Sequence, residues 1–360
     1  MTHLNAFRKE LAKAGADAAI LSDGLNQRYL SGFPFDDGLL LVTPEQAYLL
    51  TDFRYEEAAK AQVDDAWQVL CPGRGGMLAE VLSLLGEDHC KTVFVEEATL
   101  TIETYERFSQ KLIGITLKGG ASAILSALRR KKDAKELETI AKAQAITDAA
   151  FSHILTVLSP EMTEVEVALE LEYFMRKNGA EGLAFATIAV SGSNSSKPHG
   201  VPRPQKLEKG FLTMDFGAKY DGYCSDMTRT VVLGKADAEM KKLYNTVKTA
   251  QESALAAAHE GAICRDLDGV ARKIIDDAGY EGCFGHSLGH GVGLYIHETP
   301  NLAPGANPEV RLERGHVVTF EPGIYIPGKY GCRIEDMACV DVDGKFYDFT
   351  KSKKELIELF

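Results

Sequence analysis

Two apolar segments of this 360-residue chain each carry an acidic residue. Asp215 lies within residues 211–216, which read FLTMDF, and Glu321 ends residues 316–321, which read HVVTFE. Burying an ionised carboxylate is costly unless it is paired with a cation or binds a metal. Both segments are therefore predicted to be strands that carry an acid into a functional site.

Two further acids lie in segments that also resemble strands. Asp226 lies within residues 223–230, YCSDMTRT, and Glu335 lies within residues 332–337, CRIEDM. Because successive side chains of a strand point to opposite faces, Arg333 is predicted to share a face with Glu335. The chain thus offers four acids on strands and a cation beside one of them.

A glycine-rich segment adds histidines to this set. Residues 285–293 read GHSLGHGVG, and His297 follows four residues later. The glycines allow close approach of the backbone. A phosphate-binding loop is the competing interpretation, but the Walker lysine and the Gly-x-Gly-x-x-Gly spacing are both missing. His286, His290 and His297 are therefore candidates for the same site as the acids.

Four carboxylates and one imidazole form a hard, oxygen-rich ligand set that suits two divalent ions such as Mn²⁺ or Co²⁺. Two ions about 3.5–4 Å apart can share a water molecule, lower its pKa and polarise a carbonyl. A soft thiolate site would need clustered cysteines, whereas the seven cysteines are scattered. These are expected to be reduced thiols that are buried as small hydrophobic residues.

The first third of the chain alternates short apolar runs with helical patterns, which predicts an α/β domain. Strands are expected at 18–21, 38–43, 47–51 and 92–95, and helices at 4–14, 55–61, 77–85 and 102–112. The domain boundary is placed within 122–132, dividing the chain into 1–126 and 127–360. The basic run from Arg129 to Lys132 is interpreted as a solvated linker, because Asp133 and Glu136 dilute its charge.

The second domain is predicted to be α+β, with Gly-punctuated strands between long helices. After a long helical pattern that follows Asp133, helices are expected at 163–179, 236–259 and 267–278, and strands at 184–191, 211–216, 223–233, 317–320 and 331–342. Three short matches suggest an internal repeat: LEKG at 207 and LERG at 312, DFG at 215 and EPG at 321, and SDM at 225 and EDM at 335. If they reflect a duplication rather than chance, two half-domains bring their acids to one shared site.

The composition excludes several classes of protein. At 45% hydrophobic and 26% charged residues the chain is globular, and its length predicts about two domains. The net charge of −12 argues against capture of nucleic acid or anionic lipid. No apolar run is long enough for a membrane span, and residues 1–16 suit an amphipathic helix better than a secretion signal, so a cytoplasmic protein is expected.

The motifs together resemble one family. DFGA at 215, SDMTRT at 225, His286-x-x-x-His290-Gly-x-Gly, EPGIY at 321 and RIED at 333 are similar, in order, to those of the proline-directed pita-bread metallopeptidases, the Xaa-Pro dipeptidases and aminopeptidases P. Residues 26–33 and 51–55 resemble the creatinase-like N-terminal domain of that branch. The resemblance implies an α/β N-terminal domain followed by a pita-bread catalytic domain with a pseudo-two-fold internal repeat.

The resemblance also implies a role for each matched residue. The two metal ions, Mn²⁺ with Co²⁺ or Zn²⁺ as alternatives, would be bound by Asp215, Asp226, His290, Glu321 and Glu335. Glu321 is also the implied proton carrier, His199 faces the substrate, and His297 stabilises the tetrahedral intermediate. Arg333 would hold the carboxylates in position, and His286 would lie beside the site.

The implied activity is hydrolysis of the bond between an N-terminal residue and proline in dipeptides or short peptides, by a homodimer. Whether the chain is a dipeptidase or an aminopeptidase P stays open, because the closure of the pocket beyond proline is not visible in one sequence. Three further classes compete with this activity: a methionine aminopeptidase, a creatinase-like C–N hydrolase without metal and a non-enzymatic binding module. The extra N-terminal domain disfavours the first class, and the five intact ligands disfavour the second and third.

Overall fold

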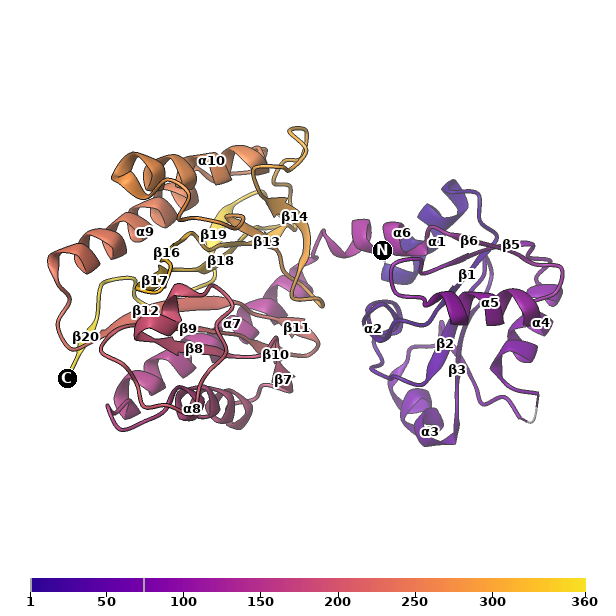
Figure 1. The fold of residues 1–360 in the computed structure, drawn as a ribbon. Coiled ribbons are helices and arrows are strands. Elements are labelled where there is room, and N and C mark those ends of the chain that lie inside the picture. The colour runs from indigo at the N-terminus through magenta and orange to yellow at the C-terminus, as the bar shows by residue number, and fades with distance from the viewer. Residues whose placement is uncertain (1, 74) are drawn as a thin grey trace. The chain divides into compact units, whose positions relative to one another are not determined.

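The computed structural model describes residues 2–73 and 75–360. They divide into two compact units, with the division between Arg129 and Arg130. The boundary placed at residues 126 and 127 from the sequence lies within helix α6 (Ala121–Arg129), the last helix of the first unit. Each unit has its own sheet system and its own core (Figure 1).

The N-terminal unit is built on a six-stranded sheet in the order β4-β3-β2-β1-β5-β6. Strand β1 pairs antiparallel with β2 and parallel with β5. The strands are β1 (Ala18–Leu21), β2 (Gly38–Val42), β3 (Ala47–Thr51), β4 (Gln68–Leu70), β5 (Thr92–Val95) and β6 (Thr116–Gly119). The other helices are α1 (His3–Lys13), α2 (Gly24–Ser31), α3 (Phe53–Gln62), α4 (Met77–Glu87) and α5 (Ile102–Lys111). The predicted α/β domain is confirmed, although α2, α6, β4 and β6 were not anticipated.

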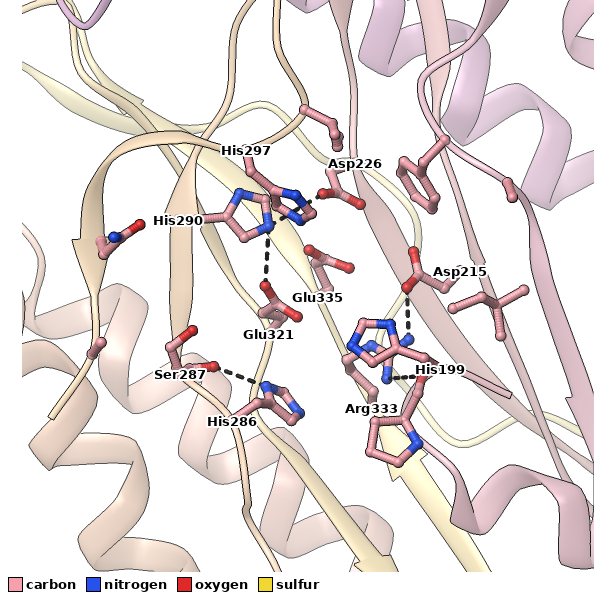
Figure 2. A pocket seen from close by; sticks show the side chains of 17 residues that line it. His199, Asp215, Asp226, His286, Ser287, His290, His297, Glu321, Arg333 and Glu335 are labelled. Carbon is pink, nitrogen blue, oxygen red and sulfur yellow. Dashed lines mark hydrogen bonds and ion pairs between the residues drawn. The ribbon is translucent and has the colours of Figure 1, made fainter. Parts of the chain in front are cut away.

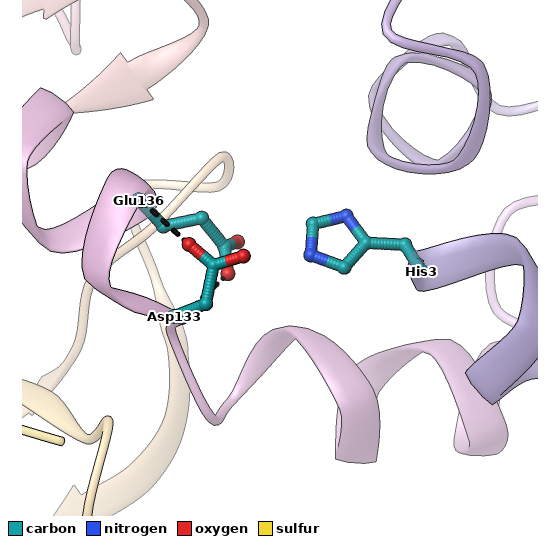
Figure 3. A group of neighbouring side chains, drawn as sticks. All are labelled: His3, Asp133 and Glu136. Carbon is teal, nitrogen blue, oxygen red and sulfur yellow. Dashed lines mark hydrogen bonds between the residues drawn. The ribbon is translucent and has the colours of Figure 1, made fainter. Parts of the chain in front are cut away.

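The C-terminal unit begins with two capped helices. Helix α7 (Ala134–Val157) starts with a capping box between Asp133 and Glu136 (Figure 3), and α8 (Glu164–Lys177) starts with one between Thr163 and Glu166. Each box satisfies backbone donors that the first helical turn leaves unpaired. Helices α9 (Ala238–Ala257) and α10 (Cys264–Ile275) form the second pair, which is followed by a π-helical turn at Asp276–Tyr280.

The strands of this unit lie between the two helix pairs, with α7 and α8 on one side and α9 and α10 on the other (Figure 1). The four sheets have the orders β11-β10-β7, β20-β12-β9-β8, β14-β13-β15-β18-β19 and β16-β17. Their strands are β7 (Gly182–Leu183), β8 (Ile188–Ser191), β9 (Gly210–Phe216), β10 (Ala218–Tyr220), β11 (Tyr223–Cys224), β12 (Met227–Leu233), β13 (Gly289–Gly291), β14 (Glu298–Leu302), β15 (Val317–Phe320), β16 (Gly323–Ile326), β17 (Tyr330–Arg333), β18 (Asp336–Val340), β19 (Phe346–Asp348) and β20 (Glu358–Leu359). A 3₁₀ turn, η1 (Gly192–Ser196), follows β8.

The two halves of the C-terminal unit repeat one arrangement, which confirms the predicted internal repeat. In each half, a residue just before the second helix forms an isolated antiparallel bridge to the segment that precedes the first acidic strand. Thr163 pairs with Lys206 before β9, and Ile263 pairs with Arg311 before β15. One core packs α7 and α8 against β9 and β12, and another packs α9 and α10 against β15 and β18. The two acidic strand pairs, β9–β12 and β15–β18, therefore occupy corresponding places.

Two predicted strands are interrupted at the acids that they carry. The strand expected at 223–233 is broken into β11 and β12 before Met227, and the strand expected at 331–342 is broken into β17 and β18 between Arg333 and Asp336. Asp226 and Glu335 occupy these breaks. The strand expected at 184–191 is also shorter, since β8 begins only at Ile188. Because the pairing of the strands is interrupted here, the side chains of Asp226 and Glu335 need not alternate between the two faces of a sheet.

Two other expectations need correction. The basic run is not wholly a solvated linker, because Arg129 ends helix α6 and Lys132 is only 3% exposed. All seven cysteines are free thiols, but Cys71 is exposed and Cys283 is half-buried. No helix among the described residues is both long and apolar enough to cross a membrane.

Candidate active site

The nine residues singled out from the sequence come together in one pocket of the C-terminal unit, with a volume of about 570 Å³. They are His199, Asp215, Asp226, His286, His290, His297, Glu321, Arg333 and Glu335. Figure 2 shows their side chains converging from several strands and loops on a shared space. Residues from distant parts of the chain thus meet in one site.

Each half of the unit contributes acids to this space. Asp215 lies on β9 and faces Thr228 of β12 across an antiparallel pair, and Asp226 directly precedes β12. From the second half, Glu321 directly follows β15 and Glu335 lies between β17 and β18. The backbone N–H of Glu335 donates to the carbonyl of Thr228 over 3.1 Å. This bond joins the two halves at the acids themselves.

The donor set fits divalent cations. Asp226, His290 and Glu335 each offer a ligand atom, and these atoms lie within 4.8 Å of one another. Two buried carboxylate oxygens, Asp215 Oδ1 and Glu335 Oε1, have no hydrogen-bond partner among the described residues. A buried charged oxygen without a partner is costly, and oxygen ligands of this kind are those that Mn²⁺ and similar ions accept.

The pKa values of the acids in the pocket also favour a cation site. Burial, followed by the neighbouring carboxylates, raises the pKa of Asp226 and of Glu335 well above the ordinary range. Burial also raises the pKa of Asp215, even though the Arg333 guanidinium opposes the shift. Acids crowded together in this way favour protons or cations among them.

His290 is oriented by its neighbours. Its Nδ1 lies 3.0 Å from the carbonyl oxygen of Gly291, and its Nε2 lies 3.3 Å from Glu321 and 3.7 Å from Asp226 (Figure 2). Burial alone would lower the pKa of His290, but the Glu321 carboxylate outweighs burial and raises it. The carbonyl contact fixes the ring so that Nε2 faces the carboxylates, as a histidine ligand requires.

Close backbone packing makes this orientation possible. A Cβ atom on Gly289 would lie 1.9 Å from the carbonyl oxygen of Thr319, and one on Gly291 would lie 2.5 Å from that of Thr299. Only glycine allows the short strand β13 to lie this near its neighbours. Within residues 285–293, the expected close approach of the backbone does not hold at Gly285, where a Cβ would have no heavy atom within 4 Å.

Arg333 binds several parts of the site at once. Its guanidinium donates to Asp215 over 2.6 Å, to Thr228 over 2.9 Å and to the Pro198 carbonyl over 3.3 Å. Thr228 in turn donates to Glu335 over 2.6 Å. Sequence reasoning missed Thr228, although its place two residues after Asp226 in a strand-like segment was a usable signal.

Tyr325 also belongs to this network. Its hydroxyl lies 3.0 Å from His286 Nε2 and accepts a 2.6 Å hydrogen bond from Arg333. Burial raises the pKa of Tyr325 to about 12, and burial also lowers the pKa of His286. Both groups are therefore neutral near pH 7, and together they support the arginine.

The segment that carries His199 is attached to helix α8 through Glu164. This buried carboxylate accepts hydrogen bonds from the backbone and hydroxyl of Ser191, from the side chain of Asn194 and from the backbone and guanidinium of Arg203. On its other side, Ser195 accepts a hydrogen bond from the backbone of Gly331. The loop between β8 and β9 is thus held on both sides of His199, at Ser191 and Asn194 before it and at Arg203 after it.

We expect Glu164→Gln to lower the free energy of unfolding by about 2–3 kcal/mol at pH 7, because hydrogen bonds to a buried charge are lost. Burial alone would raise the pKa of Glu164, but hydrogen bonds from Arg203 and Ser191 outweigh it and lower the pKa below its ordinary value of 4.5. A lowered pKa means that the unfolded state binds the proton more readily, so this stability is present above pH 4.5 and is lost as the pH falls through the folded-state pKa.

Thermal unfolding of the two proteins as a function of pH tests this expectation. The difference in unfolding temperature should shrink below pH 4.5. Glu161→Gln is the matched control, because Glu161 pairs with Lys206 at an exposed position and should matter little. A difference in unfolding temperature that stays constant down to pH 3 would contradict the stabilising role of the ionised Glu164 carboxylate.

Comparison with known proteins identifies the family of each unit. Residues 138–341 match the model of metallopeptidase family M24, and residues 3–131 match the creatinase/prolidase N-terminal domain. A Pyrococcus furiosus protein named Xaa-Pro dipeptidase is 36% identical over 357 residues, which cover 98% of this chain and 99% of the relative. An uncharacterized Bacillus subtilis peptidase is 38% identical, with 99% of each chain covered.

Solved structures give the same result for the fold. A Bacillus anthracis structure described as an Xaa-Pro dipeptidase has a TM-score of 0.93 at 39% identity and covers 99% of both chains. A Thermotoga maritima structure described as an X-Pro aminopeptidase has a TM-score of 0.89 at 35% identity, covering 96% of this chain and 98% of its own. The predicted pita-bread fold with its additional N-terminal domain is confirmed, and the chain belongs to metallopeptidase family M24 with a creatinase/prolidase N-terminal domain.

Proposed function

We propose that this protein is a metal-dependent exopeptidase that cleaves the bond between an N-terminal residue and proline, acting as an Xaa-Pro dipeptidase. The observation that carries the proposal is the convergence of four carboxylates and His290 in one pocket. One buried oxygen of Asp215 and one of Glu335 have no hydrogen-bond partner in the part of the chain that the structure describes. The names of full-length relatives, which include Xaa-Pro dipeptidases, support the same substrate class.

Five side chains would hold two divalent ions: Asp215, Asp226, His290, Glu321 and Glu335. When bound, the ions would activate a water molecule and polarise the scissile carbonyl. We propose Mn²⁺ as the native metal, with Co²⁺ and Zn²⁺ as alternatives, because an oxygen-rich site accepts several ions.

The remaining polar residues would act on the substrate. His297, whose ring centroid lies 4.4 Å from that of His290, would donate a hydrogen bond to the oxyanion that develops on the scissile carbonyl. Glu321 would carry a proton from the attacking water to the departing prolyl nitrogen. His199 would face the substrate, and Arg333 and His286 would keep Asp215 and Tyr325 in place.

The apolar side chains of the pocket suit the proline ring. Phe185, Ile188 and Ile296 line the same space as the histidines. Proline forms a tertiary amide without an N–H, so the site needs no acceptor for that donor. Binding of the ring would rest on burial of its apolar surface instead.

An aminopeptidase P that acts on longer peptides is the second candidate, since an X-Pro aminopeptidase is among the similar structures. We further propose that the enzyme works as a homodimer in the cytoplasm. Light scattering on the purified protein tests the dimer, and a monomer at all concentrations would contradict it.

The decisive experiment is an assay of purified protein that has been stripped with EDTA and reconstituted with Mn²⁺. We expect release of proline from Ala-Pro, a slower reaction with Ala-Pro-Ala and no cleavage of Met-Ala-Ser. A faster reaction with Ala-Pro-Ala would favour the aminopeptidase P, and cleavage of Met-Ala-Ser would favour a methionine aminopeptidase. Activity that survives chelation would support metal-free C–N hydrolysis, and no activity on any substrate would overturn the proposal.

A further inference from the structure

A buried ion pair lies beside His297, at the start of the strand that pairs with the strand of His290. Lys132 Nζ lies 2.9 Å from Glu298 Oε2, and the two side chains are only 1% and 4% exposed. Glu298 is the residue after His297 and the first residue of β14. Lys132 lies far earlier in the chain, just after the division between the two units.

Strands β13 and β14 pair antiparallel and, with the residues between them, form residues 289–302, the His290–His297 hairpin. The carboxylate of Glu298 fills the inside of this hairpin. Its Oε1 accepts a hydrogen bond from the backbone of Tyr295 over 3.3 Å. A Cβ atom on Gly293 would lie 2.6 Å from Glu298 Oε2, so the glycine leaves the space that the carboxylate occupies. In the ladder, Glu298 faces Gly291, the neighbour of His290. The shape of the hairpin therefore depends on where this carboxylate is held.

Lys132 is itself held firmly. Its backbone N–H donates to the carbonyl of Gly315 over 2.9 Å, and Gly315 has a φ of +81°. A Cβ atom on Gly315 would lie 2.6 Å from the carbonyl oxygen of Lys132. The next residue, Asp133, begins the capping box of α7 (Figure 3). The ammonium group thus projects from a backbone that is fixed on both sides.

We propose that Lys132 and Glu298 are positioning residues that hold the His290–His297 hairpin in its catalytic shape, so that a residue at the start of the C-terminal unit supports the active site. A buried charge that loses its partner is strongly unfavourable. Without Lys132, the Glu298 carboxylate would move toward solvent and displace the hairpin. His297 adjoins Glu298 in sequence and is exposed, so it would be affected first. The catalytic part of this inference rests on the proposed function, and the structural part does not.

The test compares Lys132→Met with Lys131→Met. Lys131 is the adjacent residue and also forms an ion pair, with Glu313 at 2.6 Å, but both side chains of that pair are about half exposed. We expect amide hydrogen exchange of residues 289–302 in the metal-free protein to be at least about tenfold faster in Lys132→Met and unchanged in Lys131→Met. Equal exchange in the two folded variants would overturn the proposal. This measurement needs neither metal nor substrate.

Kinetics separate positioning from general stability. Lys132→Met should lower kcat on Ala-Pro at least about tenfold with a smaller change in KM, and Lys132→Arg should recover much of the loss. The double variant Lys132→Met/Glu298→Gln also removes the carboxylate that has lost Lys132, so it should unfold at a higher temperature than Lys132→Met yet keep the low kcat. Recovery of kcat together with stability would reduce the pair to a structural role and overturn the proposal.

Two outcomes keep this proposal distinct from the proposed function. If the unmodified protein hydrolyses no Xaa-Pro substrate, the proposed function fails, while the exchange data still decide whether the pair holds the hairpin. If Lys132→Met does not fold, the double variant Lys132→Met/Glu298→Gln replaces it, because it removes both charges of the pair together. Slower turnover with faster exchange of residues 289–302 in the double variant would support the proposal, and unchanged exchange would overturn it.

Discussion

Replacing Glu335 by glutamine is expected to lower kcat for Ala-Pro by about a thousandfold or more. The change keeps the shape of the side chain but removes one of the charges proposed to hold both ions. Metal-ion catalysis contributes several kcal/mol to stabilising the transition state, and each 1.36 kcal/mol is about tenfold in rate. Steady-state assays with saturating Mn²⁺ measure the effect, and Glu313→Gln, at an exposed ion pair, should retain full activity.

The same substitution should stabilise the metal-free protein. Burial and neighbouring carboxylates raise the pKa of Glu335 above 4.5, its ordinary value, so the folded protein binds this proton more tightly than the unfolded chain does. The contribution of such a group is full below pH 4.5 and is lost as the pH rises through the folded-state pKa. In EDTA at pH 7, Glu335→Gln should therefore unfold at a higher temperature than the unmodified protein. Mn²⁺ should stabilise the unmodified protein more than the variant, and equal stabilisation would contradict the ligand assignment.

Replacing Arg229 by methionine is expected to lower the free energy of unfolding of the C-terminal unit by about 3–5 kcal/mol, because it leaves Asp336 buried without this partner. Arg229 is 1% exposed, donates to Asp336 over 2.7 Å and also donates to the carbonyls of Glu335 and Ser352. Burial alone would raise the pKa of Asp336, but Arg229 and Lys354 outweigh it and lower the pKa. Urea unfolding followed by circular dichroism measures the loss.

The chain offers a matched control and an internal reporter for this measurement. Arg54 also forms ion pairs with two aspartates, at 2.6 and 2.8 Å, but about half of its side chain is exposed, so Arg54→Met should change stability little. The only tryptophan, Trp67, belongs to the N-terminal unit, and its fluorescence should shift less than the circular dichroism signal in Arg229→Met. Similar losses in Arg54→Met and Arg229→Met would contradict the role of burial.

Periodic elements of the fold were predictable because burial of one face imposes a repeat on the sequence. The strands at 18–21, 47–51, 92–95 and 317–320 are found where the pattern placed them, and the helix expected from residue 163 is found as α8, which begins after Thr163. Helix α2 was missed because its buried face includes Asn26 and Gln27, so no apolar stripe marks it. Here side-chain hydrogen bonds, such as that from Asn26 to Glu96, replace apolar burial.

The members of the candidate site were also predictable, since acids within apolar strands and histidines among glycines are unusual enough to stand out. Their geometry was not. The breaks in the strands at Asp226 and Glu335 follow from contacts with the other half of the unit, such as the bond from the Glu335 backbone to Thr228. A local pattern carries no information on such contacts, because it depends on neighbours in sequence alone.

The sequence by itself therefore determined which residues carry charge, which segments alternate and which glycines permit close packing. The tertiary structure decided which charges are paired. Lys132 and Lys131 are adjacent and chemically identical, yet one is buried against Glu298 and the other lies at the surface with Glu313. The physical reason is that the energetic weight of a charge depends on its desolvation and on its partner, and both are set by residues distant in the chain.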